Sequence, residues 1–292
     1  MQYAISNWIY GEEPLRDSFA RLARYGYKGI ELKGEPDRYS ISEVKELCRE
    51  FGIRVTSVLT WCIHGIPGRD MASPNRRERL AAFRYGRLCV DLAAEVEAPI
   101  VVVLPSPAGR TSPVMRTKTE AAWKKGVAKE WDAAAESLSS LANYASKQGI
   151  VLGLEPINRY ETFLITNIDQ ALRFLQAVGA PNLKIHLDTF HMNIEEADPA
   201  AAIRRAGKLL VNMHVSDSNR EAPGRGHTDF GALLRALRDI KYPGFLALEP
   251  VPPGADAILA ATMGENLPLR DRYAEEGIRY LRGLEASMGE AR

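Results

Sequence analysis

The sequence has few cysteines, no long apolar run and no leader-like N-terminus. Its three cysteines, Cys48, Cys62 and Cys89, are odd in number and widely spaced. They therefore form neither a disulfide framework nor a CxxC site, and we expect reduced thiols that are packed or half-exposed. No stretch approaches the roughly 20 apolar residues that span a bilayer, and no basic region precedes an apolar one at the N-terminus. We therefore expect a cytoplasmic protein without a membrane partner.

The chain also lacks an excess of charge of either sign. Its 38 Lys and Arg residues balance 37 Asp and Glu residues, which gives a net charge of +1 at pH 7. This balance gives no electrostatic argument for binding nucleic acid or an anionic membrane. The 292 residues are 46% apolar and 26% charged, which is ordinary for a folded soluble protein. We expect a small-molecule ligand and no nucleic acid partner.

Short apolar runs alternate with longer segments of helical periodicity along the whole chain. The runs are continuous rather than alternating, which is typical of parallel strands buried on both faces. Eight such strands alternating with helices predict an α/β fold, a (β/α)8 (TIM) barrel that forms a single domain over residues 1–292. The candidate strands are residues 2–6, 28–32, 53–59, 99–104, 149–155, 182–188, 209–215 and 244–249.

Three segments between the strands have a clear amphipathic helical pattern, residues 131–149, 166–179 and 228–244. A doubly wound open sheet is the alternative architecture, and it typically opens with a GxGxxG turn after the first strand. The first candidate strand runs instead into SNWIYGEEP, which has one glycine, so the barrel is favoured. The N-cap candidates are Thr166 or Asn167 for the second segment and Asp229 for the third.

Acidic and imidazole side chains follow the last four candidate strands. These strands end VLGLEP, IHLDTFH, NMHVSD and LALEP, and they present Glu155, Asp188, His214 and Glu249. Catalytic groups of such barrels lie at the C-terminal ends of the strands, so we expect the four side chains on one rim. Three carboxylates would repel one another there unless a cation neutralised them. Mixed oxygen and nitrogen ligands suit manganese, cobalt, magnesium or zinc.

Further polar residues follow these strand ends at short range. Glu161 and Arg220 each lie six residues beyond a rim residue, in EPINRYE and HVSDSNR, and loops of that length can fold back over the rim. His191 could be a second metal ligand, a hydrogen-bond donor to the substrate or a packed loop histidine. Glu195 and Glu196, which end the stretch HLDTFHMNIEE, are expected to be solvated.

Together the blocks LEPINRYE, HLDTFHMNIEE, HVSDSNR and LALEP resemble the signature blocks of the ketose 3-epimerases, the D-tagatose and D-psicose 3-epimerase family of xylose isomerase-like barrels. The motif resemblance covers about residues 150–250, and the eight-unit plan extends it over the chain. It implies an isomerase that inverts C3 of a ketose through a cis-enediolate. It also implies a homodimer or homotetramer and a small-molecule sugar as substrate.

The resemblance also implies roles for individual residues. Glu155, Asp188, His214 and Glu249 would bind one divalent ion, with manganese (Mn2+) expected first and cobalt or magnesium as alternatives. The same two glutamates, Glu155 and Glu249, would exchange the C3 proton on opposite faces of the sugar. The substrate oxygens near the carbonyl would be bound by Glu161, His191 and Arg220.

Elementary acid–base chemistry agrees with this scheme. A proton next to a ketone is far less acidic than a carboxylic acid, so a carboxylate removes it only where the enediolate is strongly stabilised. A metal that chelates O2 and O3 supplies this stabilisation as a Lewis acid. Arg220 or a protonated His191 could add to it.

The resemblance weakens in the first half of the chain. WCIHGIPG, residues 61–68, follows the third strand where the family places a pocket loop, so Trp61 and His64 are expected to line the sugar site. Val251 sits where an aromatic side chain could wall the pocket, which leaves the preferred sugar open. Residues 106–126 form either a solvated lid or helix face, or a loop that closes over an anionic group of a sugar phosphate or sugar acid. The cations of this segment are Arg110, Arg116, Lys118, Lys124 and Lys125.

Other functions fit the same barrel. An aldose–ketose isomerase, or a lyase acting on an oxidised sugar or sugar phosphate, would share the metal and one base. A metal-dependent apurinic endonuclease would need many histidine ligands and a basic surface, whereas this chain has five histidines and almost no net charge. One of them, His227 in GRGHTDF, is expected in a turn before a helix. A non-catalytic sugar-binding barrel would bind a ketose without exchanging its C3 hydrogen.

Overall fold

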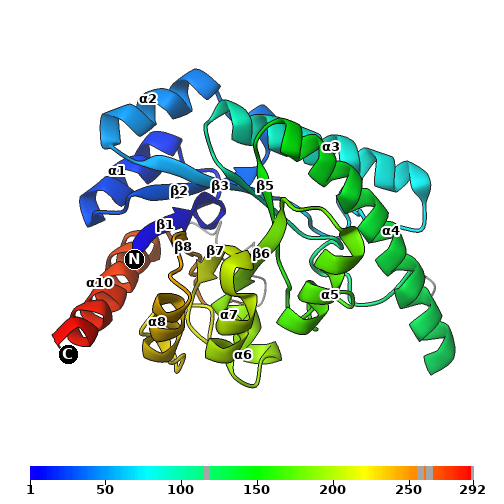
Figure 1. The fold of residues 1–292 in the computed structure, drawn as a ribbon. Helices are drawn as coiled ribbons and strands as arrows, with labels where there is room; N and C mark the ends of the chain where they lie inside the picture. Colours follow the sequence, from blue (N-terminus) through cyan, green and yellow to red (C-terminus); the bar gives the residue numbers. More distant parts are fainter. Residues whose placement is uncertain (115–118, 255–259, 261–265, 291–292) are drawn as a thin grey trace.

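Eight parallel strands close into a barrel in the computed structural model, which describes residues 1–114, 119–254, 260 and 266–290 (Figure 1). The strands follow one another around the barrel in chain order, and β1 pairs with β8 to close it. The predicted (β/α)8 barrel is confirmed, and each candidate strand overlaps one observed strand. The strands are β1 (Gln2–Ser6), β2 (Gly29–Gly34), β3 (Arg54–Thr60), β4 (Ile100–Val103), β5 (Val151–Leu154), β6 (Leu183–Asp188), β7 (Leu210–Val215) and β8 (Phe245–Leu248).

Helices surround the barrel, and β1 lies beside the C-terminal helix α10 (Figure 1). The N-terminal amine of Met1 joins these two ends through Glu285, with its nitrogen 2.7 Å from Oε1. No helix in the described part of the chain is long and apolar enough to cross a membrane. The helices are α1 (Leu15–Tyr25), α2 (Ile41–Phe51), α3 (Arg76–Glu95), α4 (Glu120–Lys147), α5 (Ile168–Val178), α6 (Thr189–Glu195), α7 (Pro199–Ala206), α8 (Phe230–Asp239) and α10 (Leu267–Glu290), with short 3-10 helices η1 (Asn7–Tyr10), η2 (Pro36–Arg38) and η3 (Gly207–Leu209).

Local sequence explains where the amphipathic helices begin and end. α5 begins after Asn167, whose side chain accepts a hydrogen bond from the N–H of Gln170, and it ends at Gly179, which adopts the left-handed φ of 68°. Its apolar face is buried on the barrel, and Trp131 of α4 packs edge-on against Phe174 with ring centroids 4.9 Å apart. The predicted cap Asp229 likewise begins α8.

Two predicted helix ranges were wrong at one end. α8 ends at Asp239 rather than near Gly244, because Lys241 turns to a left-handed φ of 54° and Pro243 disfavours helix in the residue before it. α4 begins at Glu120, capped by Thr119, and therefore includes the end of the basic segment that we read as separate. Cys48, Cys62 and Cys89 are free thiols, as expected.

The interior of the barrel is polar directly below the rim. Side chains alternate between the two faces of a strand, so His186 of β6 shares its inward direction with Asp188, and Asn212 of β7 shares its own with His214. Glu31 of β2 and Ser57 of β3 face the same space. The polar layer, defined as Glu31, Ser57, His186 and Asn212, is 0 to 1% exposed. It positions the groups of the rim above it.

Candidate active site

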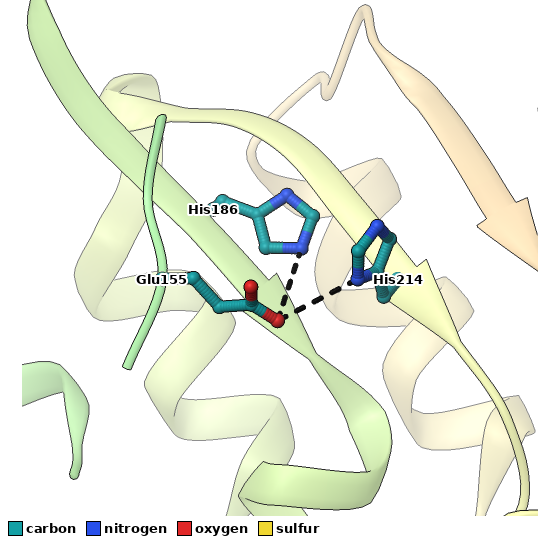
Figure 2. A group of neighbouring side chains, drawn as sticks. All are labelled: Glu155, His186 and His214. Carbon is teal, nitrogen blue, oxygen red and sulfur yellow. Dashed lines mark ion pairs between the residues drawn. The ribbon is translucent and has the colours of Figure 1, made fainter. Parts of the chain in front are cut away.

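Four predicted side chains meet at the C-terminal rim of the barrel. Glu155 follows β5, Asp188 ends β6, His214 lies in β7 and Glu249 follows β8, and all four are buried. Nδ1 of His214 lies 3.5 Å from Oε1 of Glu155 and 3.4 Å from Oε1 of Glu249. Figure 2 shows the first of these approaches. Carboxylates from two well-separated strands therefore face one imidazole nitrogen.

Two buried atoms of this rim, Nδ1 of His214 and Oδ2 of Asp188, have no hydrogen-bond partner of normal geometry among the described residues. An unpaired buried polar atom is costly, so it calls for an explanation. The other oxygen of Asp188 accepts a hydrogen bond from the N–H of Phe190 at 2.8 Å, so that Asp188 caps the beginning of α6. The free nitrogen and free oxygen, together with the two glutamates, form a donor set that fits a divalent cation.

The electrostatics of the rim also fit a cation. Burial raises the pKa of Glu249 to about 7, because a buried carboxylate is poorly solvated. Burial would lower the pKa of His214, but the carboxylates of Glu249 and Glu31 outweigh it and raise that pKa well above its ordinary value. Positive charge is therefore stabilised where the carboxylates converge.

Among the described residues, three overlapping groups of side chains each bring three donor atoms within 4.8 Å of one another. None of these groups contains all four predicted ligands. Each group does contain two or more buried carboxylates or imidazoles around the same rim. The groups are Glu155 with His186 and His214, Glu31 with His214 and Glu249, and Glu155 with Asp188 and His191.

Glu31 fixes the orientation of His214 from below. Its Oε1 lies 2.7 Å from Nε2 of His214, while its Oε2 accepts hydrogen bonds from Ser57 at 2.6 Å and Asn212 at 3.2 Å. An ionised carboxylate only accepts hydrogen bonds, so Nε2 carries a hydrogen and Nδ1 is the nitrogen turned toward Glu155 and Glu249. Metal-binding histidines commonly have such an outer carboxylate partner.

His186 lies in the polar layer beside Glu155 and His214 (Figure 2). Its Nε2 is 3.6 Å from Oε1 of Glu155, and its ring packs edge-on against that of His214 with centroids 4.1 Å apart. Burial lowers the pKa of His186 well below its ordinary value, so the ring is neutral. His186 therefore places an uncharged polar ring directly below the rim. Because His186 precedes Asp188 by two residues in one strand, the sequence could have indicated that both side chains point into the barrel.

A cavity of about 580 Å³ opens above the rim. Trp61, Glu161, His191 and Arg220, which we expect to contact the substrate, line it together with the rim glutamates. His64 was also expected to line the sugar site, but its side chain is exposed and it is not among the described lining residues. The other lining residues that matter below are Trp8, Phe190, Asn219, Val251 and Pro252.

Trp8 is a lining residue that the sequence did not single out. Its indole N–H donates to Oε1 of Glu249, and its ring packs against Trp61 with centroids 5.5 Å apart. Val251 also lines the cavity. Val251 is not aromatic, and the aromatic wall of the cavity is provided instead by Trp8 and Trp61, which follow β1 and β3. The position of Trp8 just after β1 was the signal for its place at the rim.

Arg220 is held over the cavity by a strained loop. Its guanidinium lies 3.4 Å from Glu249 and 3.5 Å from Glu161 and covers the ring of Phe190. The backbone of Arg220 has a left-handed φ of 65°, which is uncommon for a residue with a side chain. Asp217 organises the loop by accepting hydrogen bonds from the backbone N–H groups of residues 218, 224 and 228.

The basic segment does not form an anion site in its described part. Arg110 is buried and pairs with Glu130 at 2.5 Å and Asp70 at 3.1 Å. Lys124 pairs with Glu120 on the exposed face of α4, where Lys125 is also exposed. Arg116 and Lys118 lie outside the described residues.

The expectation that Glu195 and Glu196 are solvated was wrong for Glu195, whereas Glu196 is half-buried. The side chain of Glu195 is 3% exposed and accepts three hydrogen bonds from the backbone and side chain of Arg159. Glu196 accepts the N–H of Ile168 at 2.7 Å, at the beginning of α5. Glu195 thus joins α6 to the loop that follows β5, and Glu196 joins the end of α6 to the beginning of α5.

Comparisons with known proteins place this chain in a family. Residues 19–284 match the family model of the xylose isomerase-like TIM barrel. The chain is 31% identical over 254 residues to a D-psicose 3-epimerase of Ruminiclostridium cellulolyticum, which covers 85% of this chain and 80% of that protein. It is 29% identical over 257 residues to the 3-dehydro-D-guloside 4-epimerase of Escherichia coli, covering 85% and 92%.

Other matches are shorter or structural. A D-psicose 3-epimerase of Enterocloster bolteae is 42% identical over 117 residues, and this alignment spans 40% of the chain and only 39% of that relative. The crystal structure of the D-psicose 3-epimerase with D-tagatose from Clostridium cellulolyticum H10 superposes with a TM-score of 0.83 and 28% identity, covering 97% and 99% of the two chains.

The chain belongs to the xylose isomerase-like TIM barrel family. Its relatives are named as sugar epimerases, which places it among the carbohydrate epimerases of the isomerase class.

Proposed function

We propose that the protein inverts C3 of a ketose through a cis-enediolate. The observation that carries the proposal is the approach of Glu155 and Glu249 to one nitrogen of His214, at 3.5 and 3.4 Å, beside an open cavity. Two carboxylates are needed because a single base returns the proton to the face from which it came. Glu155 and Glu249 would act from opposite faces of the sugar, one removing the proton and the other delivering one.

The rim residues also suit a metal-dependent reaction. Glu155, Asp188, His214 and Glu249 would hold one divalent ion, with Mn2+ as our first choice and Co2+ or Mg2+ as alternatives. The free Nδ1 of His214 and the free Oδ2 of Asp188 support this assignment. When bound, the ion supplies Lewis-acid stabilisation of the negative charge that develops on the substrate oxygens.

The residues around the ion would bind and orient the sugar. Burial raises the pKa of Glu249 to about 7, and a group with such a pKa exchanges protons efficiently near neutral pH. Glu161, His191 and Arg220 would bind the oxygens near the carbonyl, while Trp61 walls the cavity. His64, exposed as it is, would contact the substrate only at the cavity mouth.

The charges around the cavity favour an uncharged ketose over a sugar phosphate. Arg220 already pairs with Glu161 and Glu249. Lys33, whose Nζ lies 4.2 Å from the ring centroid of the lining residue Trp61, pairs with Glu35 at 2.9 Å. Among the described residues, these cations next to the cavity are thus occupied by carboxylates, and a phosphate would meet further negative charge from the rim.

A second candidate function is epimerisation at C4 of a 3-keto sugar. The observation that favours it is the 29% identity to the Escherichia coli 4-epimerase over 92% of that protein. The chemistry would be the same, because the proton that is exchanged again lies next to a carbonyl. The aldose–ketose isomerase and the lyase remain outcomes of the test below. A homodimer or homotetramer in the cytoplasm also remains a prediction, which light scattering and fractionation can test.

The decisive experiment follows deuterium from heavy water into the sugar. The Mn2+-loaded protein is incubated with D-fructose, D-tagatose, L-ribulose, D-ribulose 5-phosphate and a 3-keto-glycoside, and each carbon is examined by NMR. We expect deuterium at C3 together with the C3 epimer of a free ketose. Deuterium at C4 of the keto-glycoside would favour the second candidate, an aldose product would show an isomerase, and an elimination product would show a lyase. Binding without any exchange would contradict all four enzymes.

A further inference from the structure

Asn158 connects two of the substrate-facing side chains. It lies in the segment after β5, is 1% exposed, and its backbone N–H points at Nδ1 of His191 at 3.3 Å. Its side-chain Nδ2 lies 2.8 Å from the same Nδ1 and donates to Oε1 of Glu161 at 2.9 Å. Its Oδ1 accepts the backbone N–H of Tyr160 at 2.9 Å. Its backbone N–H and both polar atoms of its side chain are thus engaged within the site.

These partners fix the orientation of the amide. A backbone N–H only donates, so the atom that faces Tyr160 is the oxygen, and the carboxylate of Glu161 accepts from the nitrogen. The amide assignment therefore follows from the surrounding network, as it should for an Asn side chain. Nδ1 of His191 consequently faces two N–H donors and must be the acceptor.

We propose that Asn158 is a positioning residue that fixes His191 as the Nε2–H tautomer, with that N–H directed into the cavity as a hydrogen-bond donor to a substrate oxygen. A neutral imidazole has one ring hydrogen, and Nδ1 has no room for it. Nε2 of His191 faces Oδ2 of Asp188 at 3.6 Å and Oε1 of Glu155 at 4.0 Å. The substrate part of this inference rests on the proposed function, whereas the tautomer does not.

The tautomer decides between the three roles that the sequence left open for His191. A nitrogen that carries a hydrogen has no lone pair for a metal ion, so His191 is not a ligand, although its donor atom lies near those of Glu155 and Asp188. It is also not a base, because its only free lone pair is turned to Asn158. Donation of a hydrogen bond is the remaining role.

Asn158 also couples His191 to Glu161. The same Nδ2 group contacts both side chains, and Glu161 in turn lies 3.5 Å from Arg220. Loss of the amide should therefore loosen Glu161 while the backbone N–H of residue 158 still holds Nδ1. Replacement of the amide by a carboxylate should do more, because a charged acceptor next to Nδ1 attracts a hydrogen to that nitrogen.

The test uses the full chain, labelled with nitrogen-15 at histidine and loaded with diamagnetic Mg2+. The ring nitrogens of His191 are assigned with His191→Asn and read by NMR. We expect an unprotonated Nδ1 and a protonated Nε2 in the wild type and in Asn158→Ala, and a protonated Nδ1 in Asn158→Asp. Asn193→Asp, which introduces the same charge on the exposed face of α6, should leave the spectrum of His191 unchanged.

Kinetics then separate the two substitutions. Asn158→Ala should raise KM by up to about tenfold, the value of one lost hydrogen bond, with kcat largely retained. Asn158→Asp should lower kcat as well, because the donor toward the substrate changes. A protonated Nδ1 in the wild type would overturn the proposal, as would an unchanged tautomer in Asn158→Asp. If the heavy-water experiment fails while the wild-type tautomer is as stated, the proposed function is wrong and the tautomer stands.

Discussion

The substitution Glu31→Gln tests the metal site without touching a proposed ligand. Glu31 is fully buried, its Oε1 lies 2.7 Å from Nε2 of His214, and Ser57 and Asn212 hold its other oxygen. Removal of such an outer carboxylate typically costs about 10- to 100-fold in metal affinity. Because no solvent can replace the lost charge at this depth, we expect the upper end, about 100-fold or ~2.7 kcal/mol.

The assay is a calorimetric titration of metal-free protein with Mn2+, supported by circular dichroism to confirm that the variant is folded. Glu50→Gln is the matched control, since Glu50 makes an exposed ion pair with Arg16, and it should bind Mn2+ like the wild type. A folded Glu31→Gln protein that binds Mn2+ as tightly as the wild type would refute the role given to Glu31. A wild type that binds no divalent ion would instead refute the metal site.

Three further results are expected. Glu155→Gln or Glu249→Gln should abolish measurable turnover, because each positioned acid or base contributes a factor of about 10² to 10⁴; near-normal epimerisation in either variant, read by NMR, would contradict the assignment. Asn167→Ala should cost about 1 kcal/mol in urea unfolding through loss of the α5 cap. Burial raises the pKa of Glu195, but hydrogen bonds from Arg159 outweigh burial and hold this pKa below 4.5. The ion pair of Glu195 with Arg159 therefore stabilises the fold above pH 4.5, and this stabilisation is lost as the pH falls through the lowered pKa. The acid sensitivity of unfolding should therefore be smaller in Glu195→Gln, and an identical pH dependence would argue against the pair.

The barrel could be predicted from the sequence because each element carries its own signal. Apolar runs and helical periods are local, and so are the caps of α5 and α8. The errors arose where the signal was weak. Lys241 adopts a left-handed φ of 54° that no pattern announces for lysine. The first turns of α4 are so rich in charge that the segment resembled a loop.

The rim was predictable for the same local reason. A polar residue directly after an apolar strand lies at the C-terminal end of that strand, which located Glu155, Asp188, His214 and Glu249 without knowledge of their contacts. The partners of these residues were not predictable. Glu31 lies 183 residues before His214 in the chain, and only the closure of the barrel brings β2 and β7 to face each other. Glu195 escaped for a related reason, since Arg159 belongs to a different loop.

The two rim histidines show why those unpredicted partners matter for chemistry. His214 and His191 are the same residue type near the same carboxylates, and composition or spacing cannot distinguish their roles. Glu31 accepts from Nε2 of His214 and so leaves Nδ1 as the nitrogen that faces the rim carboxylates Glu155 and Glu249. Asn158 donates to Nδ1 of His191 and so leaves Nε2–H on the side of Asp188 and Glu155, beside the cavity that His191 lines. One ring can thus bind a cation and the other can only donate a hydrogen bond, and the difference lies entirely in two buried residues, Glu31 and Asn158.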